Sequence, residues 1–329
     1  MSDLVLGIDG GGTKTLAIIV NTRGQVLGVG VGGPSNVDDV GVAAATASIE
    51  TAVRAALEAA GRQTSQLERA LNNQFAAVFL GIAGVVSARD RALIHGIAQS
   101  LGLAQPERIL VDHDCRIALA GGLSGRPGIV LIAGTGSSCF GADASGNTWR
   151  AGGWGSLISD EGSGYWFGRE GLTATVRALD GRGPSTAITT LMLERLEVTH
   201  PDDLLHRLYV TGISRAEVAG LATVVLDAAR GQDAVACQLI AQGSALLAEC
   251  VAAVAARLDF GSLCEVVLVG GIFRSGNLIV DPLRSALRDV SLTCNLRVPE
   301  RPPALGACLL ALEHLGALKP AMLVNLNVT

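Results

Sequence analysis

A glycine-rich segment near the start of the chain carries residue types that bind phosphate. Residues 9–15 read DGGGTKT. Gly11 and Gly12 let backbone N–H groups approach an anion without a Cβ in the way, and Thr13 and Lys14 add side-chain donors. Asp9 ends the preceding apolar run, where its carboxylate could hold the waters of a magnesium ion that bridges nucleotide phosphates. The segment therefore predicts a site for a polyphosphate and Mg²⁺.

A second loop offers the same chemistry. Residues 133–137 read AGTGS, so that Thr135 and Gly136 repeat the donors of the first loop. Each loop follows an apolar run, and a turn glycine follows each loop threonine by eleven positions: Gly24 after Thr13, and Gly146 after Thr135. One glycine loop alone is often only a tight turn, but two at equivalent places in a repeat favour phosphate binding.

Two better-known phosphate motifs do not fit these loops. A P-loop reads G-x-x-x-x-G-K-[ST] and leads into a helix, whereas Thr13 separates Gly12 from Lys14 and a strand pattern follows. Neither loop carries a G-x-G-x-x-G that opens a helix, so a dinucleotide fingerprint fails as well.

Apolar runs broken by glycine predict the strands that position the loops. Residues 4–33 and 128–156 each read as strand, glycine turn, strand, tight turn and strand. Residues 75–84 and 265–273 each read as a buried strand that ends in glycines. Each half therefore predicts a three-stranded antiparallel meander continued by strand–helix crossovers. The fold class is α/β, with a mixed five-stranded sheet flanked by helices in each half.

Helix signals fill the spaces between these strands. Helical periodicity covers residues 43–60, 234–257 and 304–315. Capping boxes are predicted where Ser87 precedes Asp90 and where Ser214 precedes Glu217.

The repeat also predicts two domains. The loop GGLSGRPG at 121–128 has the glycine and proline content of a hinge. We expect an N-terminal domain at 1–121 and a larger C-terminal domain at 122–329. The helical stretch around 160–260 has no counterpart in the first half, so it is predicted to be an insertion in the second domain.

Composition excludes several classes of function. The chain has 329 residues, of which 49% are hydrophobic and 17% charged, and its formal net charge is -5 without runs of Lys or Arg. This excludes the electrostatic footprint of a nucleic-acid-binding protein and predicts a small-molecule ligand. Glu249 and Arg257 interrupt the most apolar stretch, so no membrane span is expected. The seven cysteines are an odd number and widely spaced, which favours free, mostly buried thiols in a reducing cytoplasm.

Several motifs together resemble the N-acetylglucosamine kinases and their bacterial glucosamine kinase relatives. These motifs are DGGGTKT, GGPSN at 32–36, LGIAG at 80–84, AGTGSS at 133–138, and GGWGSLISDEGSGYWFGREG at 152–171. That family groups with the BadF/BadG/BcrA/BcrD-type ATPases in the superfamily of sugar kinases, heat-shock chaperone ATPases and actin. The resemblance implies two ribonuclease H-like (actin-like ATPase) domains with ATP and substrate in an interdomain cleft. It also implies a homodimer.

The resemblance assigns roles to individual residues. The residues that it implies for ATP binding are Asp9, Gly11, Gly12, Thr13, Lys14, Thr135, Gly136, Gly270 and Gly271, with Mg²⁺ held by Asp9 through water. The residues that it implies for the amino sugar are Asn36, Ser138, Trp154, Gly155 and Asp160. The ring of Trp154 could stack on the sugar ring, or it could serve only in packing within the protein. Tyr165, Trp166 and Phe167 are expected in the core. Ala83, Ser138 and Ser159 differ from residues of relatives, so the identity of the amino sugar stays open.

The resemblance also implies a catalytic base. Asp112 and Asp114 lie two apart at a predicted strand end, and strand alternation puts both on one face. Counting back from the Pro-Gly before the second phosphate strand, the family's catalytic Asp falls on Asp114, just before a helix expected to begin at Cys115. An Asp at that place is also a preferred N-cap. The implied reaction is phosphorylation of the sugar 6-hydroxyl by ATP.

Two other classes of function remain. One is an ATPase activator of a CoA-ester reductase or dehydratase, which needs cysteines that bind an iron–sulfur cluster across a dimer; no cysteine spacing here indicates such ligands. The other is an actin-like filament protein, which would not require the GGWG…DEGSGYW segment.

Overall fold

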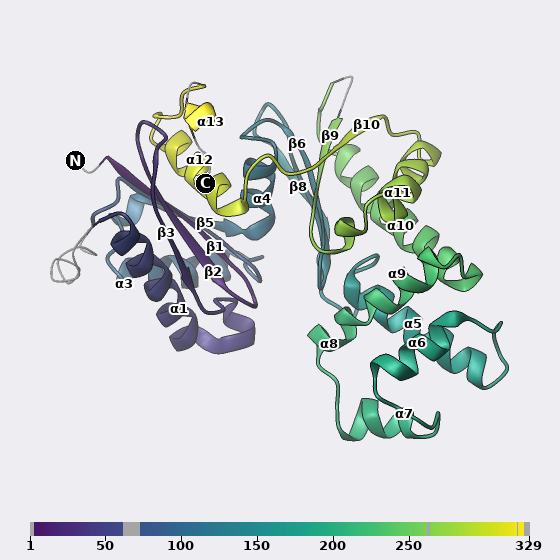
Figure 1. Ribbon diagram of the computed structural model, residues 1–329. Coiled ribbons are helices and arrows are strands. Elements are labelled where there is room, and N and C mark those ends of the chain that lie inside the picture. The colour runs from purple at the N-terminus through teal and green to yellow at the C-terminus, as the bar shows by residue number, and fades with distance from the viewer. Residues whose placement is uncertain (1–2, 62–72, 262–263, 321, 326–329) are drawn as a thin grey trace. The chain divides into compact units, whose positions relative to one another are not determined.

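We describe the protein from a computed structural model (Figure 1), which describes residues 3–61, 73–261, 264–320 and 322–325. The chain forms two compact units. The first contains Met1–Arg126 and Pro299–Thr329, and the second contains Pro127–Val298.

The first unit is built on a five-stranded mixed sheet with the order β3-β2-β1-β4-β5. Its first three strands pair antiparallel, while β4 runs parallel to β1, and β5 parallel to β4. This confirms the predicted meander with crossovers. The strands are β1 (Leu4–Gly10), β2 (Thr15–Asn21), β3 (Val26–Gly32), β4 (Ala77–Ile82) and β5 (Ile109–His113).

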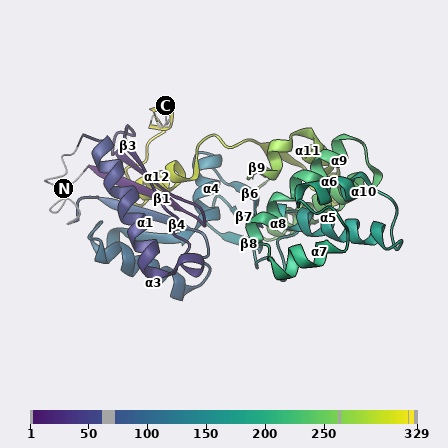
Figure 2. The same cartoon turned by 60° about the horizontal axis from the view of Figure 1, so that its bottom comes forward.

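Helices cover both faces of this sheet, which is why β1 and β4 are apolar at nearly every position. On one face, Leu6 and Ile8 pack with Ile49 of α1 (Val37–Ala59) and Ile94 of α3 (Ala88–Ser100). On the other face, Val5 packs with α4 (Asp114–Gly122) and α12 (Pro303–His314). Figures 1 and 2 show α1 and α12 on opposite sides of the sheet. The described part of this unit also contains two short helices, η2 (Pro106–Arg108) and α13 (Met322–Asn325).

Glycines on β3 let α1 lie directly on the strand backbone. Gly28, Gly30 and Gly32 share one face of the strand because side chains alternate. A Cβ on them would lie 2.0–2.1 Å from the carbonyl oxygens of Ala56, Ala52 and Ser48, one helical turn apart. The strand therefore fixes the position of α1, and with it the loop that begins the helix.

The second unit repeats the topology of the first. Its sheet has the order β10-β9-β6-β7-β8, with β6, β7 and β8 antiparallel, β9 parallel to β6 and β10 parallel to β9. This order matches the first sheet strand for strand, which confirms the predicted duplication. The strands are β6 (Gly128–Ala133), β7 (Ser137–Ala142), β8 (Thr148–Gly152), β9 (Cys264–Val269) and β10 (Cys294–Arg297).

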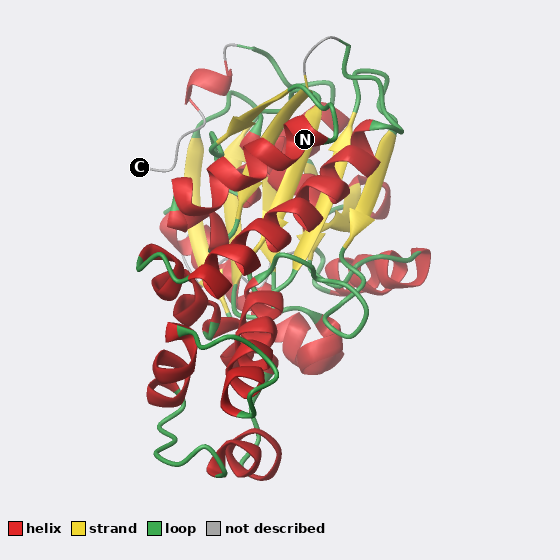
Figure 3. Cartoon of the chain, turned by 90° about the vertical axis from the view of Figure 1, so that its right-hand side faces the viewer, coloured by secondary structure: helices red, strands yellow, loops and turns green. Residues whose placement is uncertain are grey.

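The elements between β8 and β9 are all helical, as predicted (Figure 3). They bury Phe167 fully and Trp166 almost fully in the core of the second unit, whereas Tyr165 is only half-buried. These helices are α5 (Gly164–Leu179), α6 (Ala187–Arg195), α7 (Asp203–Leu205), η3 (His206–Val210), α8 (Arg215–Gly220), α9 (Ala222–Arg230) and α10 (Ala234–Ala255). After β9 follow η4 (Ile272–Ser275) and α11 (Asn277–Asp289). Both predicted capping boxes are present.

The domain boundaries differ from the expected 1–121 and 122–329. The first unit extends to Arg126, and the C-terminal residues from Pro299 return to it. The cause is α12, whose apolar face packs on the first sheet and on α4. A Cβ on Gly306 of α12 would lie 2.0 Å from the carbonyl oxygen of Ile117, so the two helix backbones touch. The sequence indicates the link that leads from the first unit to the second. That the C-terminal residues belong to the first unit depends on the packing of α12.

Two described helices are long and apolar enough to cross a membrane by length and composition, namely Val37–Ala59 and Ala234–Ala255. The expectation that the chain has no membrane span stays a prediction. In the structure α1 packs on β2 and β3, and α10 packs on β6, β7 and β8, as core helices do.

We expect Gly30→Ala to destabilise the protein, because a Cβ there would lie 2.1 Å from a backbone oxygen of α1. Overpacking of this kind lowers the free energy of unfolding by about 1–3 kcal/mol. Urea denaturation measures the change. The control is Gly96→Ala on α3, where a Cβ would meet nothing within 4 Å, and where alanine should stabilise the helix by about 0.5–1 kcal/mol. Equal effects of the two substitutions would contradict the close contact of α1 and β3.

Candidate functional site

The first phosphate loop connects β1 to β2, and hydrogen bonds fix it at Gly11. The N–H of Gly11 donates to the carbonyl oxygen of Lys14 at 3.1 Å, and the carbonyl of Gly11 accepts from the N–H groups of Ser35 and Asn36. Within the described residues, the N–H groups of Gly12, Thr13 and Lys14 have no hydrogen-bond partner. All three residues are exposed. The loop thus presents unpaired donors, as an anion site requires.

Asp9 lies at the end of β1 among charged neighbours. Burial and, to a smaller extent, the carboxylate of Asp114 raise the pKa of Asp9 to about 6, and the ammonium group of Lys14 opposes the shift. The structure therefore brings together Asp9, Lys14 and Asp114, which the sequence predicts as site residues. Two neighbouring carboxylates of which one resists ionisation favour a bound cation, so these oxygen donors fit Mg²⁺.

Asn36 has a structural role that the sequence analysis missed. It is the N-cap of α1: its Oδ1 accepts from the N–H of Asp38 at 3.2 Å, and its Nδ2 donates to Oδ2 of Asp39 at 2.7 Å. Its own N–H donates to the carbonyl of Gly11. The predicted sugar residue therefore lies directly beside the first phosphate loop.

The two candidate bases at the end of β5 have different surroundings. Asp112 accepts hydrogen bonds from Arg91 at 2.9 Å, from Arg116 at 3.1 Å and from the N–H of His113 at 2.9 Å. Burial would raise the pKa of Asp112, but the charge on His113 and the bonds from Arg91 and Arg116 hold it below its usual range. Both oxygens of Asp112 are therefore occupied by structural partners.

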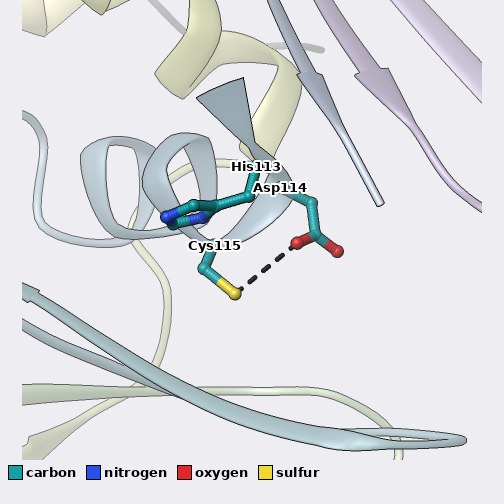
Figure 4. Close-up of side chains that lie close together, drawn as sticks. All are labelled: His113, Asp114 and Cys115. Atoms are coloured by element: carbon teal, nitrogen blue, oxygen red, sulfur yellow. Dashed lines mark hydrogen bonds between the residues drawn. The ribbon is translucent and has the colours of Figure 1, made fainter. Parts of the chain in front are cut away.

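Asp114 is more available. Its Oδ1 accepts only a weak hydrogen bond, 3.5 Å long, from Sγ of Cys115 (Figure 4). No ion pair involves Asp114 in the part of the chain that the structure describes. The expected start of α4 at Cys115 is wrong by one residue, because the helix begins at Asp114 and its N-cap is His113, whose side chain accepts from the N–H of Arg116. Asp114 is thus not the cap.

His113, Asp114 and Cys115 could in principle hold a metal ion, since their ligand atoms lie within 4.8 Å of one another. Two features oppose this. Nδ1 of His113 is engaged with the N–H of Arg116 at 3.3 Å, and the positive end of the α4 dipole lies here. In Figure 4 the imidazole and the carboxylate also lie on different sides of the helix start. We assign no metal to these residues.

The second phosphate loop connects β6 to β7 and is tied to the start of α5. The carbonyl of Gly134 accepts from the N–H of Gly164 at 2.8 Å, and the carbonyl of Thr135 accepts from the N–H of Tyr165 at 3.1 Å. The N–H groups of Thr135 and Gly136 have no partner among the described residues. As in the first loop, backbone carbonyls accept hydrogen bonds from the protein, while neighbouring N–H groups have no partner among the described residues.

Asp160 is a buried anchor for this loop. Only 3% of the residue is exposed. Its Oδ1 accepts from the N–H of Ser137 at 3.2 Å, and its Oδ2 accepts from Arg215 at 2.6 Å. Its φ of 64° lies in the left-handed region, which costs a non-glycine residue free energy unless the surroundings require it. A carboxylate predicted only for the sugar thus also organises the phosphate loop.

The segment after β8 carries the other predicted sugar residues. Oγ of Ser138 is buried and has no hydrogen-bond partner among the residues that the structure describes, and a Cβ on Gly153 would lie 2.7 Å from it. Trp154 is 68% exposed, so it does not belong to the core; Arg150 lies 5.1 Å from the centre of its ring. Gly155 has a φ of 88°. Ser138 and Trp154 are therefore a polar group and an aromatic face without a complete set of partners.

Gly270 and Gly271 follow β9 and lie at the second phosphate loop. Gly270 has a φ of 117°, and a Cβ there would lie 2.2 Å from the carbonyl oxygen of Ala133 and 2.9 Å from the N–H nitrogen of Gly134. Within the second unit, the structure thus brings Gly270 next to the loop that carries Thr135 and Gly136, residues that were likewise predicted for ATP binding.

The cysteines show no arrangement that indicates the ligands of an iron–sulfur cluster. Cys115, Cys139, Cys264 and Cys308 are buried, as predicted for most of the thiols, while Cys237 is exposed. Cys264 and Cys294 are partners on β9 and β10, a pair that sequence spacing did not reveal. Burial, and to a smaller extent the neighbouring Cys294, raise the pKa of Cys264 to about 12. Thiols of this kind remain protonated and are poor metal ligands.

Arg215 is the main site residue that the sequence analysis missed. The capping box of Ser214 and Glu217 places it at the start of α8. Its pairing with Asp160, 55 positions earlier in the chain, depends on how α8 packs on α5, and no local sequence signal encodes that contact.

The chain resembles known proteins over most of its length. The model of the BadF/BadG/BcrA/BcrD ATPase family matches residues 6–311. An N-acetylmuramic acid/N-acetylglucosamine kinase of Clostridium acetobutylicum is 33% identical over 285 residues, which are 86% of this chain and 90% of the relative. An N-acetyl-D-glucosamine kinase of Dictyostelium discoideum is 28% identical over 315 residues, 94% of this chain and 98% of the relative.

Solved structures share the fold. A candidate N-acetylglucosamine kinase of Chromobacterium violaceum superposes with a TM-score of 0.72 and 28% identity, over 94% of this chain and 99% of that one. A ROK family glucokinase of Streptomyces griseus superposes with a TM-score of 0.54 and 19% identity, over 93% and 97%. The two similar sheets and these neighbours confirm the expected pair of ribonuclease H-like domains.

The raised pKa of Asp9 predicts a pH-dependent stability. Asp9 binds its proton more tightly in the folded protein, with a pKa of about 6, than at the ordinary value of 3.8. The stabilisation is therefore full below pH 3.8 and is lost as the pH rises through 6. Without metal, Asp9→Asn should therefore raise the free energy of unfolding, and with it Tm, relative to the wild type: by about 2–3 kcal/mol at pH 8 and by about half of that at pH 5.

Thermal unfolding in EDTA at the two pH values measures this difference. The control is Asp289→Asn on the surface of α11. This substitution should change Tm only slightly, and by the same amount at both pH values. A pH-independent effect of Asp9→Asn would contradict the raised pKa.

Proposed function

The chain belongs to the BadF/BadG/BcrA/BcrD ATPase family, and we propose that it is an ATP-dependent kinase that phosphorylates the 6-hydroxyl of an amino sugar, N-acetylglucosamine or glucosamine. The names of the relatives in Clostridium acetobutylicum and Dictyostelium discoideum support the substrate class. Because the relative from C. acetobutylicum is also named for N-acetylmuramic acid, that sugar is a third candidate.

One observation carries the nucleotide part of the proposal. Each unit has a hairpin loop at the same place in its sheet whose N–H groups are unpaired among the described residues: Gly12, Thr13 and Lys14 in one, Thr135 and Gly136 in the other. Backbone donors fixed in this way stabilise the charge on a phosphoryl group during transfer. Mg²⁺, held by Asp9 through water, would neutralise part of that charge.

Asp114 acts as the general base in this proposal. It takes the proton of the sugar hydroxyl while the hydroxyl oxygen bonds to the γ-phosphorus, the bond from that phosphorus to the β,γ-bridging oxygen breaks, and ADP leaves. The carboxylate of Asp114 accepts one weak hydrogen bond, from Cys115, which supports this role. Asp112 is already bonded to Arg91 and Arg116. Asp9 lies near both Asp114 and Lys14, since the charges of these two residues shift its pKa.

In this proposal the sugar is held in part by groups that lack a complete set of partners. The buried Oγ of Ser138 needs a hydrogen-bond partner, and a sugar hydroxyl or amide supplies one. A site built in this way strongly rejects an analogue without the matching group. The exposed ring of Trp154 offers an apolar face to a pyranose, and Asn36, Gly155 and Asp160 complete the proposed set.

A substrate screen tests the reaction. With Mg-ATP, the protein should release ADP when N-acetylglucosamine, glucosamine or N-acetylmuramic acid is added, and much less with glucose. The control is 6-deoxy-N-acetylglucosamine, which should bind without causing ADP release because the proposed acceptor oxygen is missing. ATP hydrolysis at the same rate with and without sugar would contradict the proposed kinase, and activity with the deoxy sugar would contradict the 6-hydroxyl.

A matched pair of substitutions tests the base. Asp114→Asn should lower kcat by roughly 10²- to 10⁴-fold, the usual cost of losing a general base, with Tm and both substrate affinities nearly unchanged. Asp112→Asn should lower Tm, because two arginines lose their ionic partner, and should change kcat much less. Steady-state kinetics and thermal unfolding measure both variants. A larger loss of kcat in Asp112→Asn would show that the base is misassigned.

A further inference from the structure

Arg215 lies at the second phosphate loop but belongs to none of the predicted motifs. Its Nη2 donates to Oδ2 of Asp160 at 2.6 Å. The two side chains differ in burial: 4% of the Asp160 side chain is exposed, against 50% of the Arg215 side chain. One end of the guanidinium is thus fixed on a buried carboxylate, while the rest faces solvent.

The backbone that carries Arg215 is held firmly. Helix α8 packs on α5 through two glycines one turn apart: a Cβ on Gly168 would lie 1.9 Å from the carbonyl oxygen of Val218, and a Cβ on Gly164 would lie 3.0 Å from that of Ala219. The capping box of Ser214 and Glu217 fixes the start of α8. Since Gly164 also donates to Gly134 of the loop, α8 and the loop are anchored to the same end of α5.

The guanidinium touches the loop at the point where donors are unpaired. A Cβ on Gly136 would lie 2.8 Å from Nη2 of Arg215 and 2.8 Å from Oδ2 of Asp160. The unpaired N–H groups of Thr135 and Gly136 belong to the same turn. Positive charge and backbone donors therefore occur together.

We propose that Arg215 binds the phosphate chain of the nucleotide at the second loop, with Asp160 as the residue that positions it. The inference rests on the proposed function only in that this loop binds a nucleotide. A guanidinium has five N–H donors, and the bond to Asp160 uses one, so others remain for phosphate oxygens. Arginine suits this task because its planar group binds two phosphate oxygens at once.

A purely structural ion pair accounts for the arrangement less well. The attraction between the two groups is offset by the cost of removing the buried carboxylate of Asp160 from water. The protein nevertheless keeps Asp160 buried and at a φ of 64°, which is costly for stability alone. Strained residues of this kind occur at sites that must be held in one geometry.

Titration calorimetry with AMP, ADP and a non-hydrolysable ATP analogue tests the proposal. Arg215→Gln should leave AMP affinity unchanged, weaken ADP, and weaken the ATP analogue most, by about 10- to 100-fold, as expected for lost charge-assisted hydrogen bonds. Asp160→Asn keeps an acceptor for the N–H of Ser137 but loses the charge that holds Arg215. Its affinities for the three nucleotides should therefore fall in the same order, but by smaller factors. The matched control is Arg207→Gln in η3, which removes an arginine that is paired with Glu217 of α8 and should change none of the three affinities.

The dependence on phosphate number separates the possible outcomes. An equal loss for AMP, ADP and the ATP analogue in Arg215→Gln would mean that the arginine only supports the fold, and no loss would mean that it does not reach the phosphates; either result overturns the proposal. The sugar screen is independent. If the wild type binds nucleotide through Arg215 but releases no sugar-dependent ADP, the kinase assignment fails and this inference stands.

Discussion

Close contact between backbones, possible only at glycine, is the constraint on which the rest of the structure depends. It places α1 on β3 through Gly28, Gly30 and Gly32, α12 on α4 through Gly306, and α8 on α5 through Gly168. Each contact positions residues of the candidate site. The first places Asn36, the second supports the helix that begins with Asp114, and the third carries Arg215. A Cβ in any of these contacts would push a helix outward and shift the side chains that it bears.

The second principle is the uneven distribution of partners among the carboxylates. Asp112 is bonded to two arginines and Asp160 to Arg215 and a loop N–H, so both hold structure in place. Asp114 has one weak bond, and the pKa of Asp9 is raised by burial and by Asp114. The carboxylates without strong partners are those next to the first phosphate loop, where a cation and a reacting hydroxyl would supply the missing interactions.

Much of this follows from the sequence because it is local or periodic. The two mixed sheets and the capping boxes follow from apolar runs broken by glycine and from Ser-x-x-Asp/Glu spacing, and the structure confirms them. The return of α12 to the first unit, the pairing of Arg215 with Asp160 and the contact of Cys264 with Cys294 join residues far apart in the chain, and only packing reveals them. Strand parity could not separate Asp112 from Asp114. Arg91, which lies on another helix, separates them by binding Asp112. The expected interdomain cleft, homodimer and cytoplasmic location stay predictions.

A crystal structure with a non-hydrolysable ATP analogue, Mg²⁺ and N-acetylglucosamine tests the account most directly. We expect the triphosphate to accept hydrogen bonds from the N–H groups of the first loop and of Thr135 and Gly136. We expect the sugar 6-hydroxyl to lie within hydrogen-bond distance of Asp114, with the hydroxyl oxygen in line with the γ-phosphorus. A nucleotide bound away from either loop, or a sugar whose 6-hydroxyl faces away from Asp114, would contradict it.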